Sequence, residues 1–187
     1  LLLPDHHHAA SPPPSPPSAP APSGAAPPAA VQAINFWAVR PPIDAQGHAT
    51  VPEGVTSIAS SAFREWASLV SVTLPTTLVS IGDEAFFGCS SLASVTFPAT
   101  LTSIGASAFW GCSFLTSAAF PAGLTTIGYW AFYRCSALTT ANLSASLTSI
   151  DEEAFEACSS LTTITLPLPD GLSIGNGAFS DCPLDDE

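Results

Sequence analysis

Residues 78–98 read LVSIGDEAFFGCSSLASVTFP, and residues 101–121 read LTSIGASAFWGCSFLTSAAFP. The two stretches are versions of one unit that recurs at a constant interval over most of the chain. Its most regular positions are a phenylalanine, at Phe63, Phe86, Phe109, Phe132, Phe155 and Phe179, and an isoleucine five positions earlier, at Ile58, Ile81, Ile104, Ile127, Ile150 and Ile174. The last interval is longer by one position, because the turn over residues 168–171 is extended. A fixed period of about 23 residues predicts a solenoid.

One unit alone is too small to bury its apolar positions, so neighbouring units must stack to form a continuous core. Apolar residues that alternate with polar ones predict a short strand at the same place in each unit. These predicted strands are residues 71–74, 94–97, 117–120, 140–143 and 163–166. We expect a second short extended piece at Ile81, and one turn of 3₁₀ or α helix over residues 84–89 that carries Phe86 inward.

The pattern IGxxAFxGCSSLxSVTFP of residues 81–98 resembles the BspA-like, or Treponema pallidum-type, leucine-rich repeat, and the resemblance extends over residues 49–184. It implies a leucine-rich-repeat solenoid of about six 23-residue turns, curved and right-handed. Short parallel β-strands would form its concave face, and short 3₁₀ or α turns its convex side. Members of the family are mostly surface or extracellular proteins that bind other proteins, and the resemblance implies no enzyme activity. Ala118 and Ala141 stand where the quoted unit has Val95, which predicts a less regular middle of the face.

Composition divides the chain into three regions. Residues 1–30 form a Pro/Ala-rich arm with nine prolines in residues 11–28, and proline lacks the backbone donor that helices and sheets need, so we expect an extended spacer. Residues 31–48 are an aromatic capping or docking segment, and residues 49–187 are the solenoid. The histidines at 6–8 lack the fixed geometry and the fourth ligand of a zinc site, which favours a solvated tail.

The charge balance excludes several classes of partner. Asp and Glu number 15 against 3 Lys and Arg, the net charge is −12, and there is no lysine. Such a chain cannot neutralise a phosphate backbone, and it is not attracted to anionic lipid headgroups, so we expect no nucleic-acid partner. No apolar run approaches the roughly 18 residues of a membrane-spanning helix, although peripheral association with a membrane complex stays open.

The residues needed for catalysis or metal binding are few. All four histidines, at 6–8 and 48, lie outside the well-formed repeats, so no base is available to the many serines of the repeats. We therefore expect no enzyme activity, no cofactor and no metal site. The carboxylates of Asp151, Glu152, Glu153 and Glu156 fall on one turn. They form either a solvated acidic patch or a weak calcium site, and the lack of a loop that wraps an ion favours the patch.

Five cysteines stand three positions after the recurrent phenylalanines, at Cys89, Cys112, Cys135, Cys158 and Cys182. Neighbouring turns lie about 4.8 Å apart, which is close enough for a disulfide. However, the number is odd, and side chains on a parallel ladder point the same way. Buried free thiols that act as small hydrophobic groups are the favoured interpretation.

Three functional hypotheses follow. The first is a non-enzymatic module that binds a protein through the concave strands, as an adhesion-type protein at the cell surface or secreted. Its candidate binding residues are Ser71, Thr73, Ser94, Thr96, Ser117, Thr140, Asn142, Thr163 and Thr165. The second is a linker or scaffold subunit of a large assembly, such as an algal photosynthetic complex in the chloroplast, held through Phe36, Trp37 and Arg40. The third is ice binding by the Ser/Thr rows, which Ala119 and Asn142 interrupt.

Overall fold

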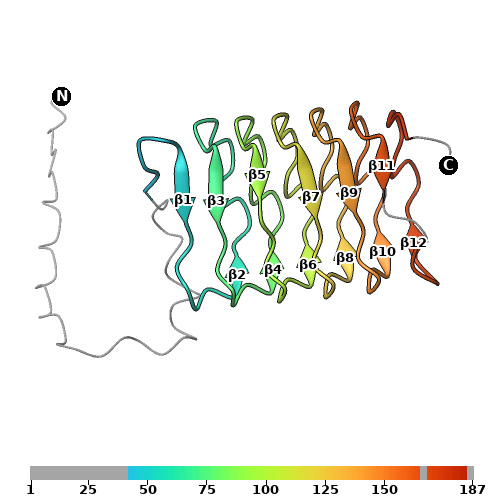
Figure 1. Ribbon diagram of the computed structural model, residues 1–187, viewed down its shortest axis with the longest axis horizontal. Helices are drawn as coiled ribbons and strands as arrows, with labels where there is room; N and C mark the ends of the chain where they lie inside the picture. Colours follow the sequence, from blue (N-terminus) through green and yellow to red (C-terminus); the bar gives the residue numbers. More distant parts are fainter. Residues whose placement is uncertain (1–41, 165–167, 185–187) are drawn as a thin grey trace, which may run out of the picture.

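The computed structural model describes residues 42–164 and 168–184. In this part of the chain, twelve short strands lie in two rows along the long axis of the array (Figure 1). The odd-numbered row consists of β1 (His48–Thr50), β3 (Ser71–Thr73), β5 (Ser94–Val95), β7 (Ser117–Ala119), β9 (Thr140–Asn142) and β11 (Thr163–Ile164). The even-numbered row consists of β2 (Ser57–Ile58), β4 (Ser80–Ile81), β6 (Ser103–Ile104), β8 (Thr126–Ile127), β10 (Ser149–Ile150) and β12 (Ser173–Ile174).

All strand ladders are parallel, and their register repeats the sequence period. Ile58 pairs with Ile81 and Ile81 with Ile104, each one period on. Ile150 pairs with Ile174, which lies one position beyond a full period. The added residue is therefore absorbed before β12 without a change of register. The predicted solenoid and both of its extended pieces are confirmed, because each turn contributes one strand to each row.

The helical turn expected over residues 84–89 is not confirmed, and the described part of the chain contains no helix. Hydrogen-bonded turns occupy this place instead. Phe87 N–H donates to the Glu84 carbonyl within its own turn, at 3.0 Å, whereas Phe86 N–H donates to Ala108 in the next turn, at 2.7 Å. Glu84 and Gly88 have φ values of 56° and 68°. Successive backbone N–H groups here donate alternately to a carbonyl of their own turn and to one of the next turn. This pattern cannot continue a helix, in which every N–H donates within its own segment.

The core is a stack of the recurrent phenylalanines. Successive ring centroids lie 4.7 Å apart at the Phe63–Phe86 pair and 5.3 Å apart at the Phe155–Phe179 pair, with ring planes within 9° of parallel. These distances match the spacing of neighbouring strands, so each turn brings its ring directly over the previous one. Leu92, Leu115 and the isoleucines of the even-numbered row pack around the stack, most of them with almost no exposure.

The N-terminal end of the array is closed by a short antiparallel contact. Ile43 forms a bridge with Ala49 and packs against the core. Asp44 Oδ1 accepts N–H groups from Gln46 and His48, each at 2.9 Å, and these bonds lower the pKa of the Asp44 carboxyl. The regular array thus begins at His48. Residues 1–41, which include the predicted Pro/Ala-rich arm and most of the aromatic segment, lie outside the described residues.

Candidate functional site

The odd-numbered strands bring most of the predicted binding residues to one surface. Ser71, Thr73, Ser94, Ser117, Thr140, Asn142 and Thr163 lie on these strands, and Thr96 lies directly after β5. Ser71 and Thr140 are half-buried and the other six are exposed. We call these eight residues the hydroxyl face. Thr165 lies outside the described residues.

Strand register sets the spacing of the hydroxyl face. Ser71 lies opposite Ser94, and Thr140 lies between Ser117 and Thr163. Inward residues of the same strands, such as Val72 and Ala141, are buried. Because residues alternate between the two sides of a strand, this burial turns the hydroxyl-bearing side chains outward. The result is rows of small, uncharged groups about 4.8 Å apart.

His48 belongs to this surface, although the sequence placed it outside the well-formed repeats. Its Nδ1 lies 2.7 Å from Ser71 Oγ, and its Nε2 lies 3.1 Å from Thr73 Oγ1. His48 precedes Ser71 by one full period, so the repeat itself predicts this position. Hydroxyl groups occupy both ring nitrogens, which leaves neither of them for a carboxylate that would orient the ring. The arrangement is therefore not that of a serine–histidine–acid triad.

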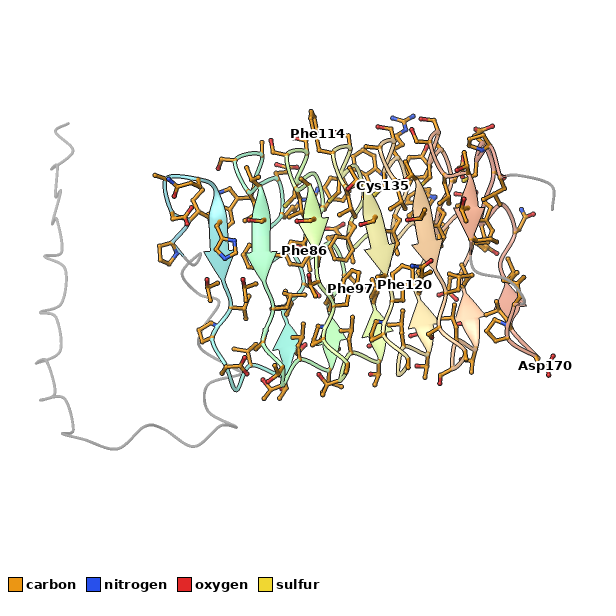
Figure 2. All side chains as sticks on the ribbon, viewed as in Figure 1. Phe86, Phe97, Phe114, Phe120, Cys135 and Asp170 are labelled. Carbon is orange, nitrogen blue, oxygen red and sulfur yellow. The ribbon has the colours of Figure 1, made fainter. Side chains whose placement is uncertain are left out.

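The thiols form a second regular series inside the array. Cys89 Sγ donates to the Phe63 carbonyl at 3.0 Å, and the other four cysteines contact the carbonyl of the preceding turn's phenylalanine at 3.1–3.3 Å. All five are free thiols, as expected (Figure 2 labels Cys135). They do more than fill space, since each one also links its turn to the previous one. Burial raises the pKa of Cys112 and Cys135 above the ordinary range.

The predicted acidic patch lies beside an aromatic pair. Tyr129 stacks on Trp130 with ring centroids 4.3 Å apart, and Trp130 Nε1–H donates to the Glu153 carboxylate. Loss of hydration and the negative charges of Glu153 and Asp181 raise the pKa of Glu156. Within the described residues, no group of three or more His, Cys, Asp or Glu side chains has the arrangement of a metal site.

The predicted docking residues Phe36, Trp37 and Arg40 lie outside the described residues, as do the histidines at 6–8. Across residues 42–164 and 168–184, no helix is long and apolar enough to cross a membrane. The hydroxyl face is thus the predicted site that the structure brings together. What it offers is hydrogen bonding and shape.

The repeats match a known family. The sequence model of the BspA type leucine-rich-repeat region matches residues 56–185 in six copies. The chain belongs to the BspA-type leucine-rich-repeat family. Proteins with this repeat typically bind other proteins, and the family and fold are generally non-enzymatic.

Solved structures with this repeat have a similar fold. A leucine-rich-repeat protein of Treponema pallidum is 30% identical with a TM-score of 0.63, and the match covers 75% of this chain and 78% of that one. A leucine-rich cell surface protein of Faecalibacterium prausnitzii is 29% identical with a TM-score of 0.53, over 74% of this chain and 46% of that one. A leucine-rich-repeat protein of Eubacterium ventriosum is 22% identical with a TM-score of 0.64, over 75% of this chain and 44% of that one, and shows the fold alone. Among curated protein sequences, none matches significantly.

Proposed function

We propose that the protein binds another protein through the hydroxyl face, as a recognition module at the cell surface or in the secreted fraction. The observation that carries the proposal is the set of exposed side chains, such as Thr73, Thr96 and Asn142, on strands whose inward side is locked into the core. A rigid surface loses little conformational entropy on binding. The family's typical use of this fold for protein binding supports the same conclusion.

The chemistry of the hydroxyl face favours a neutral, polar and extended segment of the partner. Six of its eight residues are exposed, all are small, and none carries a charge. Binding a segment across the strands would not require the hydroxyl face to lose the hydration of any charged group, so the free-energy cost of desolvation is low. Hydroxyl and amide groups can both donate and accept hydrogen bonds to the segment. His48, at the β1 end, would meet one end of such a segment.

The test is a selection of displayed peptides on the wild-type protein, followed by binding measurements on two variants. Thr96→Arg places a long charged side chain at the middle of the hydroxyl face, and we expect selected peptides to lose at least tenfold in affinity. Ala99→Arg adds the same side chain at an exposed position of the loop between β5 and β6 and serves as the matched control. Peptides that bind Thr96→Arg as well as wild type would overturn the proposal.

The proposed location rests on one relative that is named as a cell surface protein, 29% identical to this chain. The measurement is protease accessibility of the repeats in intact cells that make the protein. We expect an added protease to remove the repeats while a cytosolic marker survives. Repeats that survive until the cells are lysed would contradict a surface location.

A linker role is the second candidate, and one observation favours it. Ile43 forms a bridge with Ala49 and packs against the core, so a segment that precedes Ile43 is joined to a fixed point at the β1 end of the array. A native extract separated on a density gradient distinguishes the two roles. Migration with a large assembly that is lost on deleting residues 1–41 would support the linker. The same migration after the deletion would contradict the linker role. The deletion ends before Ile43 and Asp44, so both residues keep their place at the start of the array.

A further inference from the structure

The outer side of the even-numbered row is hollowed by two adjoining clefts. The larger, of about 540 Å³, extends from Asp83 past Thr126 to Asp151, and the smaller, of about 370 Å³, extends from Asp151 to Ser173 and Gly175. Tyr129 and Asp151 line both. The clefts therefore form one continuous groove that crosses β4, β6, β8, β10 and β12, and we call it the even-row groove.

The floor of the even-row groove is built from small groups. Ser103, Thr126 and Ser149 face outward from the strands because the isoleucines beside them are buried. Gly105 and Gly128 follow those isoleucines. A Cβ at Gly105 would lie 2.5 Å from Asp83 Oδ1, and one at Gly128 would lie 2.8 Å from Ala106 N. Turns approach too closely there for a side chain, which keeps the groove open.

Every charged side chain that lines the groove is acidic. Asp83, Asp151 and Glu152 are all exposed. Asp83 Oδ1 accepts the Ala106 N–H at 2.8 Å, which fixes the direction of that carboxylate.

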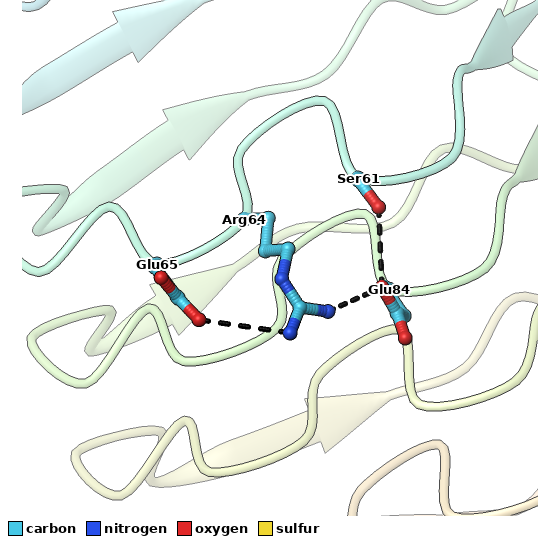
Figure 3. Close-up of polar contacts among 4 residues, drawn as sticks. All are labelled: Ser61, Arg64, Glu65 and Glu84. Atoms are coloured by element: carbon cyan, nitrogen blue, oxygen red, sulfur yellow. Dashed lines mark hydrogen bonds and ion pairs between the residues drawn. The ribbon is translucent and has the colours of Figure 1, made fainter.

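The two arginines of the described residues lie elsewhere. Arg64 pairs with Glu84, which also accepts from Ser61 Oγ, and lies 3.6 Å from Glu65 (Figure 3). Arg134 lies over the Tyr133 ring at 5.2 Å. Neither lines the groove, so its negative charge is not balanced by a cation of the described chain.

We propose that the even-row groove binds an extended basic segment of a partner protein, with two basic side chains four positions apart. Asp83 and Glu152 occupy the same position of their units, and three turns separate them. Three turns span about 14 Å at strand spacing. A step from i to i+4 in an extended chain also spans about 14 Å, and the two side chains point to the same side. A segment that crosses the strands thus places one basic group at Asp83 and the other at Glu152.

Tyr129 gives the groove a preferred direction. It lies one turn before Glu152 and two turns after Asp83, and it is about 36% exposed. Trp130 stacks on one face of this ring. The aliphatic stem of an arginine that reaches Glu152 would lie along the other face, and its guanidinium would gain from the aromatic ring. Tyr129 is the one aromatic side chain among the residues that line the two clefts, so an arginine at Asp83, two turns from it, has no such ring beside it. The proposal concerns a different surface from the hydroxyl face and does not rest on the proposed function.

The test uses nine-residue peptides of Ser, Thr and Val, capped at both ends, that contain two arginines. In one peptide the arginines are four positions apart, and in the other they are two apart, with the same composition and charge. Isothermal titration calorimetry against the full chain measures both. We expect the peptide with arginines four positions apart to bind about threefold to tenfold more tightly than the other, because only this peptide can reach Asp83 and Glu152 together. Equal affinities, or no binding by either peptide, would overturn the proposal.

Three variants locate the site. Asp83→Asn keeps the oxygen that accepts the Ala106 N–H, and Glu152→Gln keeps the size of the side chain, so both should fold. Each should weaken binding of the peptide with arginines four positions apart about threefold to tenfold and remove the preference for that spacing. Glu65→Gln is the matched control, since it removes the same charge from a side chain that does not line the groove. If Glu65→Gln weakens binding equally, the peptide responds only to the net charge of −12, and the proposal fails.

Discussion

The two rows of strands have the same period but do not form the same kind of sheet. The even-numbered row is one continuous six-stranded sheet from β2 to β12, whereas the odd-numbered row is divided into β1-β3-β5 and β7-β9-β11. Strands β5 and β7 are neighbours, yet no ladder joins these two described strands. A repeated backbone therefore does not by itself guarantee a continuous sheet.

The inward residues of the two rows also differ. Every even-numbered strand ends on an isoleucine, and these are buried from Ile58 to Ile150. The inward residue of the odd-numbered strands changes from Val95 on β5 to Ala118 on β7, which is where the sheet divides. Alanine by itself does not end the ladder, because Ala118 and Ala141 pair in register between β7 and β9.

Two further phenylalanines fill the space that the small residues leave. Phe97 and Phe120 lie between the two rows in Figure 2, with ring centroids 5.7 Å apart. Phe120 also meets Phe132 edge-on at 5.5 Å and reaches Phe155, two turns away, at 6.2 Å. A large ring beside alanine keeps the core volume nearly constant, and cores tolerate such exchanges when volume is conserved. The odd-numbered row varies because its neighbours compensate.

Phe120→Ala removes this compensation and should give the largest effect. Phe120 is 8% exposed, and the inward alanines of β7 and β9, Ala118 and Ala141, are too small to fill the space that its ring would leave. We expect the free energy of unfolding to fall by about 3–5 kcal/mol, measured by urea denaturation. Phe114→Ala is the control, since Phe114 is 65% exposed and projects from the edge of the array in Figure 2. A loss below about 1 kcal/mol for Phe120→Ala would mean that the ring does not fill the space.

Truncating one inward residue in each row compares the two sheets directly. Ile104→Ala should cost about 2–5 kcal/mol, because both strand neighbours of Ile104 in its row are also isoleucine and nothing compensates. Val95→Ala should cost about 1.5 kcal/mol, the value for two methyl groups, since the next two turns already have alanine there. Equal losses would contradict the view that the odd-numbered row is the more tolerant one.

The thiol series should show a difference between the middle and the C-terminal end of the array. Contact with Cys158 lowers the pKa of Cys182, which is only half-buried, and raises the pKa of Cys158 itself. We expect Cys182 to react with a thiol reagent at pH 8 at least tenfold faster than the other four, a difference of about 1.4 kcal/mol in the barrier. Mass spectrometry of the labelled peptides gives the order in which the cysteines react. Fast labelling of Cys112 or Cys135 would mean that the middle of the array opens readily.

The sequence predicted most of the fold because one period specifies it many times. Each recurrence of Ile and Phe confirms the register of the others, and both strand rows follow from alternation within one unit. The turn at residues 84–89 was not predictable in the same way. Its form depends on hydrogen bonds to the next turn, such as Phe86 N–H to Ala108, and propensity within one turn contains no information about them.

The candidate site was predictable in part for the same reason. The outward positions of the hydroxyl face follow from strand alternation. The structure brings together eight of the nine binding residues predicted from the sequence, and Thr165 lies outside the described residues. His48 was missed because it belongs to a turn whose sequence is otherwise irregular, although its place one full period before Ser71 was visible. The even-row groove depends on how closely Gly105 and Gly128 approach the previous turn, and that distance exists only in the folded array.

Substitutions on the outside of the array should change the stability least, and Glu156→Gln tests this expectation. The pKa of Glu156 is raised by loss of hydration and by Glu153 and Asp181, so the folded chain holds its proton more tightly than the unfolded chain does. The ionised form then opposes folding above the raised pKa, and this cost disappears as the pH falls below the ordinary value of 4.5. We expect a small rise in Tm for Glu156→Gln at pH 7 and no difference from wild type at about pH 3.5. A lower Tm at pH 7 would show that Glu156 stabilises its turn, through Arg134 for example, and that charges outside the array are as constrained as the residues within it.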